Sequence, residues 1–488
     1  MQLKQLLEEL DYRLVSGSPD TDITELVYDS RKVVPGSLFV CISGTAIDAH
    51  TFVPAAVSQG AAAIVAEREV DVPEGVALVV TPSTRKALAF LSAAYFGHPA
   101  KRLITVGLTG TKGKTTTSYM LQSVLKQAGK RVGVIGTIGA VINGVHYKTA
   151  NTTPESYEIQ ALLKKMVDEG CEYCVMEVSS QGLKMDRVEG FVFDIGVFTN
   201  FSPDHIGPNE HASLEEYLYC KSLLFKRCRH GIVNRDDERW DEVSRDGSCT
   251  RETYGLSPEA DLRAEHLAYL RENGSLGIRF DLAGTMTGTV EVCTPGRFSV
   301  YNALAALAVG SRLHIPMEAM QAGLKDVHVP GRVEIVPVKE HFTILIDYAH
   351  NAASVGSLLR TLKEYEPGRL ICVYGCGGNR SRLRRYDMGK LCGELADLSI
   401  LTCDNPRMEE IKDINEDIKV GLKETNGRYI EIEDRAEAIH YSMDHALDGD
   451  IIVLLGKGHE DYQDIKGKKY PFSERKIIEE YAGKLENS

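Results

Sequence analysis

The fold of this 488-residue chain is decided by the stretch Leu103-Ile-Thr-Val-Gly-Leu-Thr-Gly-Thr-Lys-Gly-Lys-Thr-Thr116. Its first six residues are an apolar run typical of a buried strand, and a helical pattern follows from Thr117 to Gly129. A glycine-rich turn between a strand and a helix lets backbone N–H groups close on phosphate oxygens, and the helix N-terminus adds a positive dipole end. Residue 108 is Leu where the strict P-loop pattern has Gly, so the sequence predicts a variant phosphate loop.

The residue types in and near this loop predict that ATP and Mg²⁺ are bound. Lys114 is expected to neutralise the charge of the β- and γ-phosphates, and the Thr115 hydroxyl is expected to reach Mg²⁺. Glu177 and His205 each follow an apolar strand and could hold the metal beside the loop. The predicted nucleotide-contacting residues of the loop are Gly110, Thr111, Lys112, Gly113, Lys114, Thr115 and Thr116.

Seven apolar strands in the last four-fifths of the chain are each followed by a polar or glycine-containing segment. Ligands of open α/β sheets bind beyond the carboxyl ends of the strands. We therefore expect an α/β protein with parallel sheets, in which two halves of a site face each other across a cleft. Changes of pattern along the chain predict three domains, over residues 1–100, 101–330 and 331–488.

The composition restricts the partners of the chain. The formal charge is −13, which argues against nucleic acid or an anionic membrane as the main partner. The first twelve residues lack the apolar centre of a signal peptide, and no apolar run reaches the length of a membrane span. The eleven cysteines have no metal-ligand spacing and are expected to be buried free thiols. These features predict a cytoplasmic protein.

Several single residues leave two interpretations open. By its chemistry alone, Lys221 on an apolar helix is expected to be a surface lysine whose charged end reaches solvent. Asn302 could recognise adenine through its amide, although an Asn at the start of a helix is usually a cap. Asp347 could reach the ribose or phosphates of the nucleotide. Arg385, in a basic run, and Arg407, in a turn, have guanidinium groups suited to carboxylate recognition and predict an anion pocket.

With these residues in hand, the chain resembles the Mur ligases over essentially its whole length. The motifs that carry the resemblance are Thr109-Gly-Thr-Lys-Gly-Lys-Thr, Asn151-Thr-Thr-Pro, Glu177-Val-Ser-Ser, Asp204-His205, Tyr217-x-x-x-Lys221, Gly331-Arg-Val-Glu, Asp347-Tyr-Ala-His-Asn, Gly375-Cys-Gly-Gly, Asp404-Asn-Pro-Arg and Gly456-Lys-Gly-His-Glu.

The resemblance implies a smaller N-terminal α/β domain that binds a UDP substrate, a central P-loop-type ATPase and a C-terminal Rossmann-like domain that binds an amino acid. It implies that ATP phosphorylates the D-Glu carboxylate of UDP-MurNAc-L-Ala-D-Glu and that an amino acid then displaces the phosphate. In the family the lysine at Lys221 is carbamylated and helps to place Mg²⁺, which would make it a metal ligand with Thr115, Glu177 and His205. The Asp-Asn-Pro-Arg form is the one associated with meso-diaminopimelate. A monomer with these small-molecule substrates is expected.

Carried over residue by residue, the resemblance implies three groups of site residues. Catalytic roles fall to Lys114, Glu177, His205 and Lys221. The UDP substrate would be held by Tyr28, Ser30, Thr45, Ala46, Ile47, Asn151, Thr152, Thr153, Ser179, Met185 and Arg187, and the nucleotide also by Asn302, Arg332 and Asp347. The amino acid would be held by Arg385, Asp404, Asn405, Pro406, Arg407, Gly456 and Glu460.

Other functions stay open at this point. The same reaction could use L-lysine or another amino acid, and a P-loop phosphotransferase or NTPase would need no ligation step. A folylpolyglutamate synthetase shares the ATPase core, but the uridine segment and the Asp404–Arg407 turn argue against it. A catalytically silent relative is disfavoured because Lys114, Glu177 and Lys221 are all present.

Overall fold

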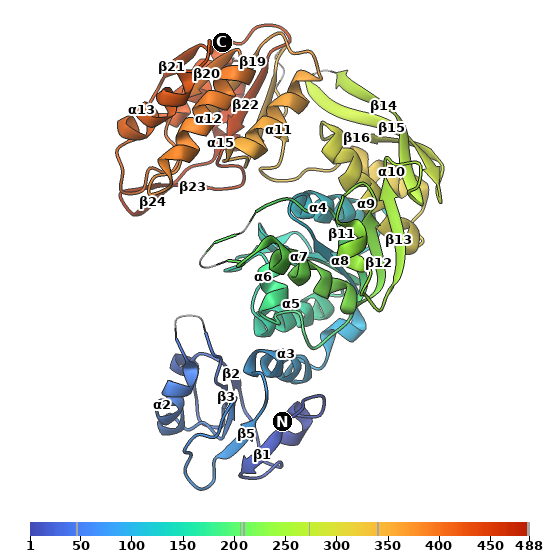
Figure 1. The fold of residues 1–488 in the computed structure, drawn as a ribbon, viewed down its shortest axis with the longest axis vertical. Helices are drawn as coiled ribbons and strands as arrows, with labels where there is room; N and C mark the ends of the chain where they lie inside the picture. The colour runs from blue at the N-terminus through green and yellow to red at the C-terminus, as the bar shows by residue number, and fades with distance from the viewer. Residues whose placement is uncertain (45–46, 205, 208–209, 273, 339–340, 486–488) are drawn as a thin grey trace. The chain divides into compact units, whose positions relative to one another are not determined.

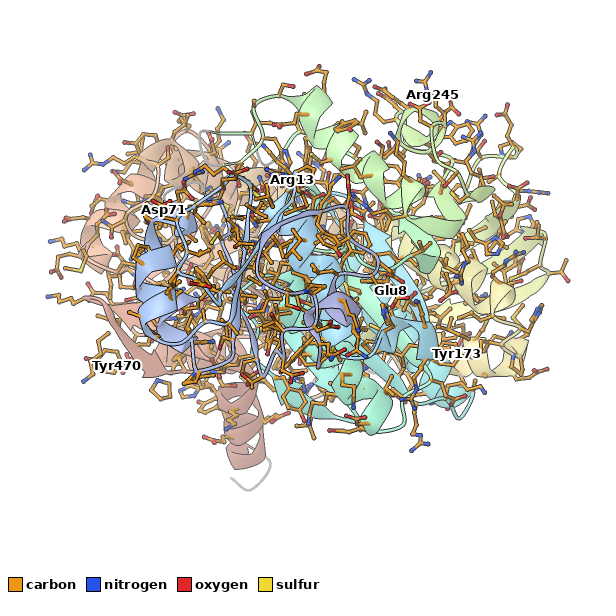
Figure 2. All side chains as sticks on the ribbon, turned by 90° about the horizontal axis from the view of Figure 1, so that it is seen from below. Glu8, Arg13, Asp71, Tyr173, Arg245 and Tyr470 are labelled. Carbon is orange, nitrogen blue, oxygen red and sulfur yellow. The ribbon has the colours of Figure 1, made fainter. Side chains whose placement is uncertain are left out.

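The computed structural model describes residues 1–488 except 45–46, 205, 208–209, 273, 339–340 and 486–488 (Figure 1). The chain forms two compact units. The first contains residues 1–261 and 305–319, and the second contains residues 262–304 and 320–488. Among the described residues, no helix is long and apolar enough to cross a lipid bilayer. Exposed charged side chains such as Glu8, Asp71 and Arg245 lie at the surface of the first unit (Figure 2).

The N-terminal domain is a five-stranded sheet in the order β1-β5-β4-β3-β2, with only β1 antiparallel to its neighbour. Alternate side chains of these strands point to opposite faces, so each face buries its own apolar cluster. Helices α1 and α3 cover one face and α2 covers the other. The elements are α1 (Leu3–Leu6), β1 (Arg13–Ser16), β2 (Leu26–Val27), η1 (Ser30–Lys32), β3 (Leu38–Val40), η2 (Ala49–Phe52), α2 (Val53–Ser58), β4 (Ala63–Ala66), β5 (Ala77–Val80) and α3 (Thr84–Tyr95).

The central domain is built on the parallel strands β13, β12, β11, β6, β10 and β7, in that spatial order, followed by the antiparallel strands β8 and β9. Because β6 lies between β10 and β11, the segments that follow these three strands meet at one edge of the sheet. The elements are η3 (Pro99–Arg102), β6 (Ile104–Thr109), α4 (Lys114–Gln127), β7 (Val132–Gly136), β8 (Gly139–Ile142), β9 (Val145–Tyr147), α5 (Ser156–Asp168), β10 (Tyr173–Glu177), α6 (Ser180–Lys184), β11 (Phe193–Phe198), α7 (Leu214–Ser222), η4 (Leu223–Lys226), β12 (Cys228–Asn234), α8 (Trp240–Ser244) and β13 (Thr250–Gly255).

The second unit contains an antiparallel β14-β15-β16 sheet and a six-stranded sheet in the order β17-β18-β22-β19-β20-β21. In the six-stranded sheet only β17 is antiparallel to its neighbour, and helices cover both faces as in a doubly wound fold. The elements are β14 (Leu262–Glu272), β15 (Ser275–Gly284), β16 (Gly288–Val292), α9 (Arg297–Arg312), α10 (Met317–Lys325), β17 (Glu334–Val336), β18 (Thr343–Asp347), α11 (Ala352–Lys363), β19 (Leu370–Tyr374), α12 (Arg382–Leu395), β20 (Leu398–Leu401), α13 (Ile411–Leu422), β21 (Tyr429–Glu431), α14 (Arg435–Asp444), β22 (Ile451–Leu455), β23 (Tyr462–Ile465), β24 (Lys468–Pro471) and α15 (Glu474–Leu485).

The chain begins with a single helical turn, Leu3–Leu6, and Leu3, Leu6 and Leu7 pack against the core. One prediction differs from the structure. The expectation of parallel sheets in each domain is incomplete, because β7–β9 and β14–β16 form antiparallel hairpins.

All eleven cysteines are free thiols and nine of them are buried, as the sequence predicted. Cys249 and Cys293 are the partly exposed ones. A hydrogen bond from the Cys228 thiol lowers the pKa of Cys249 to about 7, whereas burial raises the pKa of Cys293 to about 11. The two partly exposed thiols therefore differ in nucleophilicity at neutral pH.

Candidate active site

The phosphate loop lies between β6 and α4, where the sequence predicted it. Gly110 has φ +147° and Gly113 has φ +87°, both of which strain residues with a Cβ. A Cβ on Gly110 would lie 1.9 Å from the Thr199 hydroxyl, so close packing against the end of β11 also requires glycine. The Lys114 ammonium donates to the Gly110 and Thr111 carbonyls at 2.8 and 3.2 Å, which places its charge over the loop.

The rest of the loop is held by the segment after β11. The Asn200 side-chain oxygen accepts from the Lys112 backbone N–H at 2.9 Å, and the Asn200 carbonyl accepts from the Thr111 N–H at 2.8 Å. Thr116, in the first turn of α4, is partly exposed. The loop shape is therefore fixed by hydrogen bonds across the sheet edge before any nucleotide binds.

Glu177 and Thr115 form the oxygen-rich half of this site. Glu177 is the last residue of β10, is 1% exposed and pairs in register with Leu108 of β6. Its carboxylate accepts from the Thr115 hydroxyl at 2.9 Å, and from the backbone N–H and hydroxyl of Thr137 at 3.0 and 3.1 Å. A carboxylate and a hydroxyl beside a phosphate loop are the oxygen ligands that Mg²⁺ prefers. These two residues fit the predicted metal site.

Lys221 lies in α7 and is 1% exposed, so the expectation of a surface lysine with its charge in solvent is wrong. Its ammonium donates to the Gly110 carbonyl at 2.8 Å and lies 4.2 Å from the centre of the Tyr217 ring. Burial and the nearby Lys114 charge hold the pKa of Lys221 well below its usual value. The lysine is therefore buried against the phosphate loop, and its role as a carbamylated metal ligand stays a prediction of the family resemblance.

Some of the residues predicted to hold the UDP substrate lie beside Glu177 and Thr137. The Thr153 hydroxyl donates to the Glu177 carbonyl at 3.0 Å, and its oxygen accepts from the Ser179 N–H at 2.9 Å. The Thr152 and Thr137 hydroxyls are 3.2 Å apart. Asn151 is exposed just before them. This threonine segment thus connects the metal residues to a solvent-facing edge where a second substrate could bind.

Arg187 is fixed at this edge by its own ion pair. Its guanidinium donates to Glu155 at 2.9 and 2.7 Å and to the Thr153 carbonyl at 3.0 Å. Met185 ends α6 two residues earlier and is partly exposed. The Arg187 side chain is 15% exposed, so it is mostly covered and a small part of it reaches this solvent-facing edge.

The first-domain part of the predicted UDP site is only partly described. Tyr28 donates its hydroxyl to Glu158 of α5, and burial together with that carboxylate raises the tyrosine pKa. Ser30 begins η1 and is partly exposed, and Ile47 is 62% exposed. Thr45 and Ala46, like the predicted metal ligand His205, lie outside the described residues.

In the second unit, the residues predicted to reach the nucleotide lie around the end of β18. Asp347 is its last residue and accepts from the Val333 and Ala349 N–H groups at 2.7 Å each. Burial raises its pKa despite the nearby Arg332. The Arg332 guanidinium stacks 4.7 Å from the centre of the Tyr348 ring. Asn302 is buried within α9 and is not at its start, which does not fit the alternative interpretation as a helix cap.

All the predicted amino-acid residues except Pro406 line one cavity of about 110 Å³ in the second unit. Asp404 and Asn405 follow β20, and Gly456 and Glu460 follow β22, so parallel strand ends bring them together. Asn405 donates to Glu460 at 2.8 Å. Asp404 Oδ1 is buried and has no hydrogen-bond partner among the described residues, which suits it to accept from an ammonium group.

The two predicted arginines of this pocket differ in their contacts. Arg385 is 2% exposed and its guanidinium pairs with Glu409 at 2.8 Å and with Asp417 at 2.9 Å. Arg407 adopts φ +53° and donates Nη1 to the Gly378 carbonyl at 2.8 Å. Pro406, just before it, is buried. Arg385 is thus neutralised by two carboxylates, and Arg407 is the arginine whose remaining donors can meet a ligand.

Sequence reasoning missed Lys457, Thr137 and Tyr217. Lys457 is 0% exposed and contacts Asn405 at 3.1 Å and Glu460 at 3.3 Å. Its signal was present, because it lies inside the glycine-rich motif after β22. Tyr217, whose hydroxyl contacts that of Thr111 at 3.2 Å, also had a signal as the first residue of the Tyr217-x-x-x-Lys221 motif. Thr137 had none, since its contact with Glu177 comes from a distant part of the chain.

These features define the class of protein. They are a phosphate loop with two lysines directed at it, a buried carboxylate beside the loop hydroxyl, and a doubly wound domain with a pocket of arginines and carboxylates. This combination is that of an ATP-dependent ligase that forms an amide bond, with Mg²⁺ as its metal.

The chain belongs to the Mur ligase family. Family models match in three segments: the family's catalytic domain at residues 22–96, the middle domain at 108–310 and the glutamate ligase domain at 331–458. The chain is 40% identical over 485 residues to the UDP-N-acetylmuramoyl-L-alanyl-D-glutamate–2,6-diaminopimelate ligase of Clostridium perfringens, covering 98% of this chain and 99% of that one. It is also 40% identical to the ligase of the same name from Caldanaerobacter subterraneus subsp. tengcongensis, with full coverage of both chains. A solved structure of a ligase with this name covers both chains fully at 28% identity, with a TM-score of 0.77.

Proposed function

We propose that this ligase adds meso-diaminopimelate to the D-glutamyl carboxylate of UDP-MurNAc-L-Ala-D-Glu, a step of peptidoglycan precursor synthesis. The observation that carries the proposal is the Asp404–Arg407 turn, which presents a carboxylate, an amide and a guanidinium to one cavity. A diamino diacid offers a matching ammonium and a distal carboxylate. The names of the full-length relatives support the same substrate.

In the first step, a carboxylate oxygen of the D-glutamyl residue attacks the γ-phosphorus of ATP, and the bond to the β-phosphate oxygen breaks to release ADP. Lys114 and the N-terminus of α4 would neutralise the charge on the transferred phosphoryl group. Arg187 and the threonines at 152 and 153 would hold the muramoyl peptide so that its carboxylate lies in line with the phosphate. Thr115 and Glu177 would hold Mg²⁺, which would supply positive charge beside the phosphates.

In the second step, the amine of the amino acid attacks the acyl carbon, the phosphate leaves, and the nitrogen loses a proton. Asp404, with Asn405 and Glu460, would orient the attacking amino acid by its ammonium and carboxylate groups. Only the neutral amine is nucleophilic, so an acceptor for its proton is needed. The carboxylate of Asp404 lies in the pocket to which that ammonium would bind.

Lys221 would act as a carbamate in this mechanism. A buried lysine with a lowered pKa is partly a neutral amine, which is the form that attacks CO₂. The amine nitrogen bonds to the carbon of CO₂ and releases a proton, so the product carries a negative oxygen pair instead of a cation. Beside Thr115 and Glu177, that oxygen pair would complete an anionic ligand set for the metal.

The test is a competition between amino acids. The protein is incubated with UDP-MurNAc-L-Ala-D-Glu, ATP and Mg²⁺ and with equal amounts of meso-diaminopimelate and L-lysine, and the products are identified by mass. We expect the diaminopimelate adduct to dominate and Lys114→Ala to form none. Lys126→Ala, an exposed lysine at the far end of the same helix, is the matched control and should behave as the unmodified protein.

A dominant lysine adduct would reject the amino acid but keep the ligase. ATP consumption that does not depend on either amino acid would reject ligation. We also propose that the protein works as a monomer in the cytoplasm, where its nucleotide-activated substrate is made; light scattering of the purified chain tests the first part.

A further inference from the structure

Two of the eleven cysteines, Cys228 and Cys249, lie on neighbouring strands of the central sheet. Cys228 is the first residue of β12, and Cys249 directly precedes β13. The parallel pairing of these strands begins with His230 opposite Thr250. One step back along this register, Cys249 lies opposite Arg229, which directly follows Cys228.

This register suits a disulfide bond between the two cysteines. Neighbouring strands lie about 4.8 Å apart and successive residues of a strand about 3.3 Å apart, so the diagonal from Cys228 to Cys249 joins Cα atoms about 5.8 Å apart. Disulfides are formed between residues whose Cα atoms are about 4.4–6.8 Å apart. The backbone of the two strands therefore does not have to move for the bond to form.

The two thiols also lie on the same face of the sheet. Gly196 of β11 and Gly231 of β12 are register partners, so a Cβ added to either residue would point to the same face. A Cβ on Gly196 would lie 2.7 Å from the Sγ of Cys228. A Cβ on Gly231 would lie 3.1 Å from the Sγ of Cys249. The sulfurs thus occupy the space above two adjacent glycines, and a hydrogen bond joins the two side chains.

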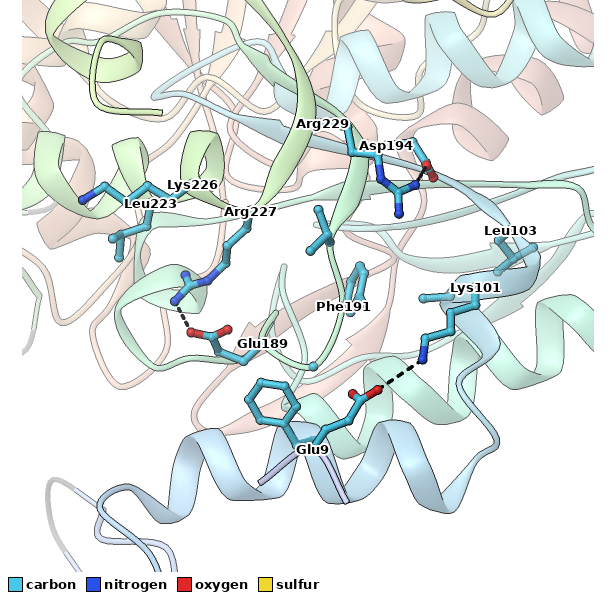
Figure 3. A pocket seen from close by; sticks show the side chains of 14 residues that line it. Glu9, Lys101, Leu103, Glu189, Phe191, Asp194, Leu223, Lys226, Arg227 and Arg229 are labelled. Atoms are coloured by element: carbon cyan, nitrogen blue, oxygen red, sulfur yellow. Dashed lines mark hydrogen bonds and ion pairs between the residues drawn. The ribbon is translucent and has the colours of Figure 1, made fainter. Parts of the chain in front are cut away.

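The start of β12 is held in place by ion pairs. Arg227 and Arg229, on either side of Cys228, both line a cavity of about 600 Å³ (Figure 3). Arg227 pairs with Glu189, and Arg229 pairs with Asp194 at 2.7 Å (Figure 3). Cys228 packs instead in the core cluster of the central domain. The ion pairs before and after Cys228 therefore fix the position of its thiol.

The two thiols differ in their access to solvent. Cys228 is 3% exposed, whereas Cys249 is partly exposed. The hydrogen bond from Cys228 and, to a smaller extent, the charge of Arg251 lower the pKa of Cys249 to about 7, although burial opposes this shift. An accessible cysteine that is partly thiolate at neutral pH and has a second thiol beside it is typical of redox-sensitive pairs.

We infer that Cys228 and Cys249 form a peroxide-sensitive pair that is oxidised reversibly to a disulfide. In the first step, the Cys249 thiolate attacks one oxygen of hydrogen peroxide, the O–O bond breaks, and the hydroxide that leaves takes a proton from solvent to become water. Cys249 is then a sulfenic acid. In the second step, the Cys228 sulfur attacks the Cys249 sulfur, the S–O bond breaks, and the hydroxide leaves as water with the Cys228 proton. Dithiothreitol reverses the change by thiol–disulfide exchange.

The structure also sets the order of the two steps. Because Cys228 is buried, peroxide meets Cys249 first. The hydrogen bond to Cys249, together with burial, raises the pKa of Cys228. A neutral sulfenic acid no longer holds the Cys228 proton by its charge, so Cys228 becomes a better nucleophile after the first step.

The pair lies far from the phosphate loop. Cys228 and Cys249 stand at the amino ends of β12 and β13, whereas the loop follows the carboxyl end of β6 in the same run of parallel strands. The oxidation therefore goes beyond the proposed function, and its test needs no substrate of the ligase.

The test counts thiols in the full-length protein. The chain is reduced, desalted without air and treated at neutral pH with a small molar excess of hydrogen peroxide. It is then denatured in iodoacetamide, the adducts are counted by intact mass, and digestion without reductant identifies linked peptides. Of the eleven thiols of the reduced protein, we expect the two of this pair to be lost to alkylation and to appear in one linked peptide pair. Dithiothreitol should restore all eleven.

Single variants separate the two steps. Cys228→Ser should stop at the sulfenic acid of Cys249, which dimedone traps, and Cys228→Ala replaces this variant if thermal unfolding shows that it does not fold. Cys249→Ser should leave Cys228 reduced, because peroxide does not reach the buried thiol. Cys293→Ser removes the other partly exposed thiol and is the matched control, which should form the disulfide as fast as the unmodified protein.

Three outcomes would overturn the inference. They are eleven alkylated thiols after peroxide, a linkage between other cysteines, and equal trapping of Cys249 by dimedone with and without Cys228. Oxidation of Cys228 in Cys249→Ser would overturn the order of the steps.

Urea unfolding tests the fit of the bond to the native strands. A disulfide that closes a segment of about twenty residues restricts the unfolded chain, so the oxidised protein should unfold at a higher urea concentration than the reduced protein. Peroxide should not change the midpoint of Cys228→Ser. A lower midpoint in the oxidised protein would show that the bond strains the two strands and would overturn the geometric basis of the pair.

Discussion

Replacing Arg407 by Ala should reduce the use of diaminopimelate far more than the use of lysine. Arg407 lines the amino-acid cavity. One of its five N–H donors is hydrogen-bonded to the Gly378 carbonyl, which leaves the others for a ligand. Its φ of +53° is equally unfavourable for Ala, so the substitution changes the side chain without relieving backbone strain. The loss is therefore that of a charge-assisted contact with the distal carboxylate, which lysine lacks.

The expected magnitude follows from that contact. A bidentate guanidinium–carboxylate pair in a small cavity is worth about 2–4 kcal/mol, which is on the order of 30- to 700-fold in kcat/KM. Arg380 and Arg384 also line the cavity and will recover part of the loss, so the lower end is expected. Arg407→Lys keeps the charge but not the planar fork and should fall between Ala and the unmodified protein.

The assay measures kcat/KM for both amino acids from phosphate release at fixed ATP and dipeptide. Arg360→Ala is the control, since Arg360 is an exposed arginine on α11 that does not line the cavity. The ratio of the two kcat/KM values should fall at least tenfold in Arg407→Ala and stay constant in the control. An unchanged ratio in Arg407→Ala would show that the distal carboxylate is bound elsewhere.

Iodoacetamide at pH 8 should alkylate Cys249 much faster than Cys293, because a thiol with a pKa of about 7 is mostly thiolate and one with a pKa of about 11 is not. The rate at Cys249, followed by peptide mass, should rise through pH 7 and level off; equal rates at the two cysteines would contradict the assignment. Gly110→Ala should abolish ATP turnover and lower the free energy of unfolding by more than about 2 kcal/mol. Gly144 has φ +83° and no atom within 4 Å of an added Cβ, so Gly144→Ala tests backbone strain alone and should lower the free energy of urea unfolding by about 1 kcal/mol. An equal loss of stability in Gly110→Ala and Gly144→Ala would exclude the clash predicted at Gly110. Glu177→Gln should raise the Mg²⁺ concentration needed for half-maximal ATP turnover at least tenfold, with ATP held constant, and an unchanged Mg²⁺ dependence would remove the residue from the metal site.

The part of the site that the sequence predicted well is the part built by strand ends. Glu177 lies 62 residues after Thr115 of the phosphate loop in the sequence, yet the parallel pairing of β6 and β10 brings the two side chains within hydrogen-bond distance. The same rule gathered Asp404 and Gly456 in the second unit. An apolar run followed by a polar residue is a local pattern, and parallel strands end at a common edge, so local information was sufficient there.

The sequence could not predict contacts that depend on which distant side chains neutralise a charge. Arg385 was expected to bind an anion of the substrate, but Glu409 and Asp417 from the following loop and helix already occupy its guanidinium. A basic run looks the same in sequence whether its charges face a ligand or an internal carboxylate. The antiparallel pairing of β14–β16 was also missed, since the alternating burial of β15 and β16 predicts strands but not the direction in which they pair.

Two buried lysines show that the sequence also does not reveal how a buried charge is compensated. Lys457 is surrounded by polar acceptors, with Glu460 at 3.3 Å and Asp404 at 3.7 Å, so its charge is compensated and orients the pocket. Lys221 is equally buried, but the acceptor of its hydrogen bond is a backbone carbonyl that also accepts from Lys114. Burial and the positive charge of Lys114 lower the pKa of Lys221, and the Asp204 carboxylate opposes this shift. The same residue type thus orients a pocket through carboxylate partners in one domain and, in the other, places two amine groups on one carbonyl of the phosphate loop, where a bound phosphate would reduce their repulsion.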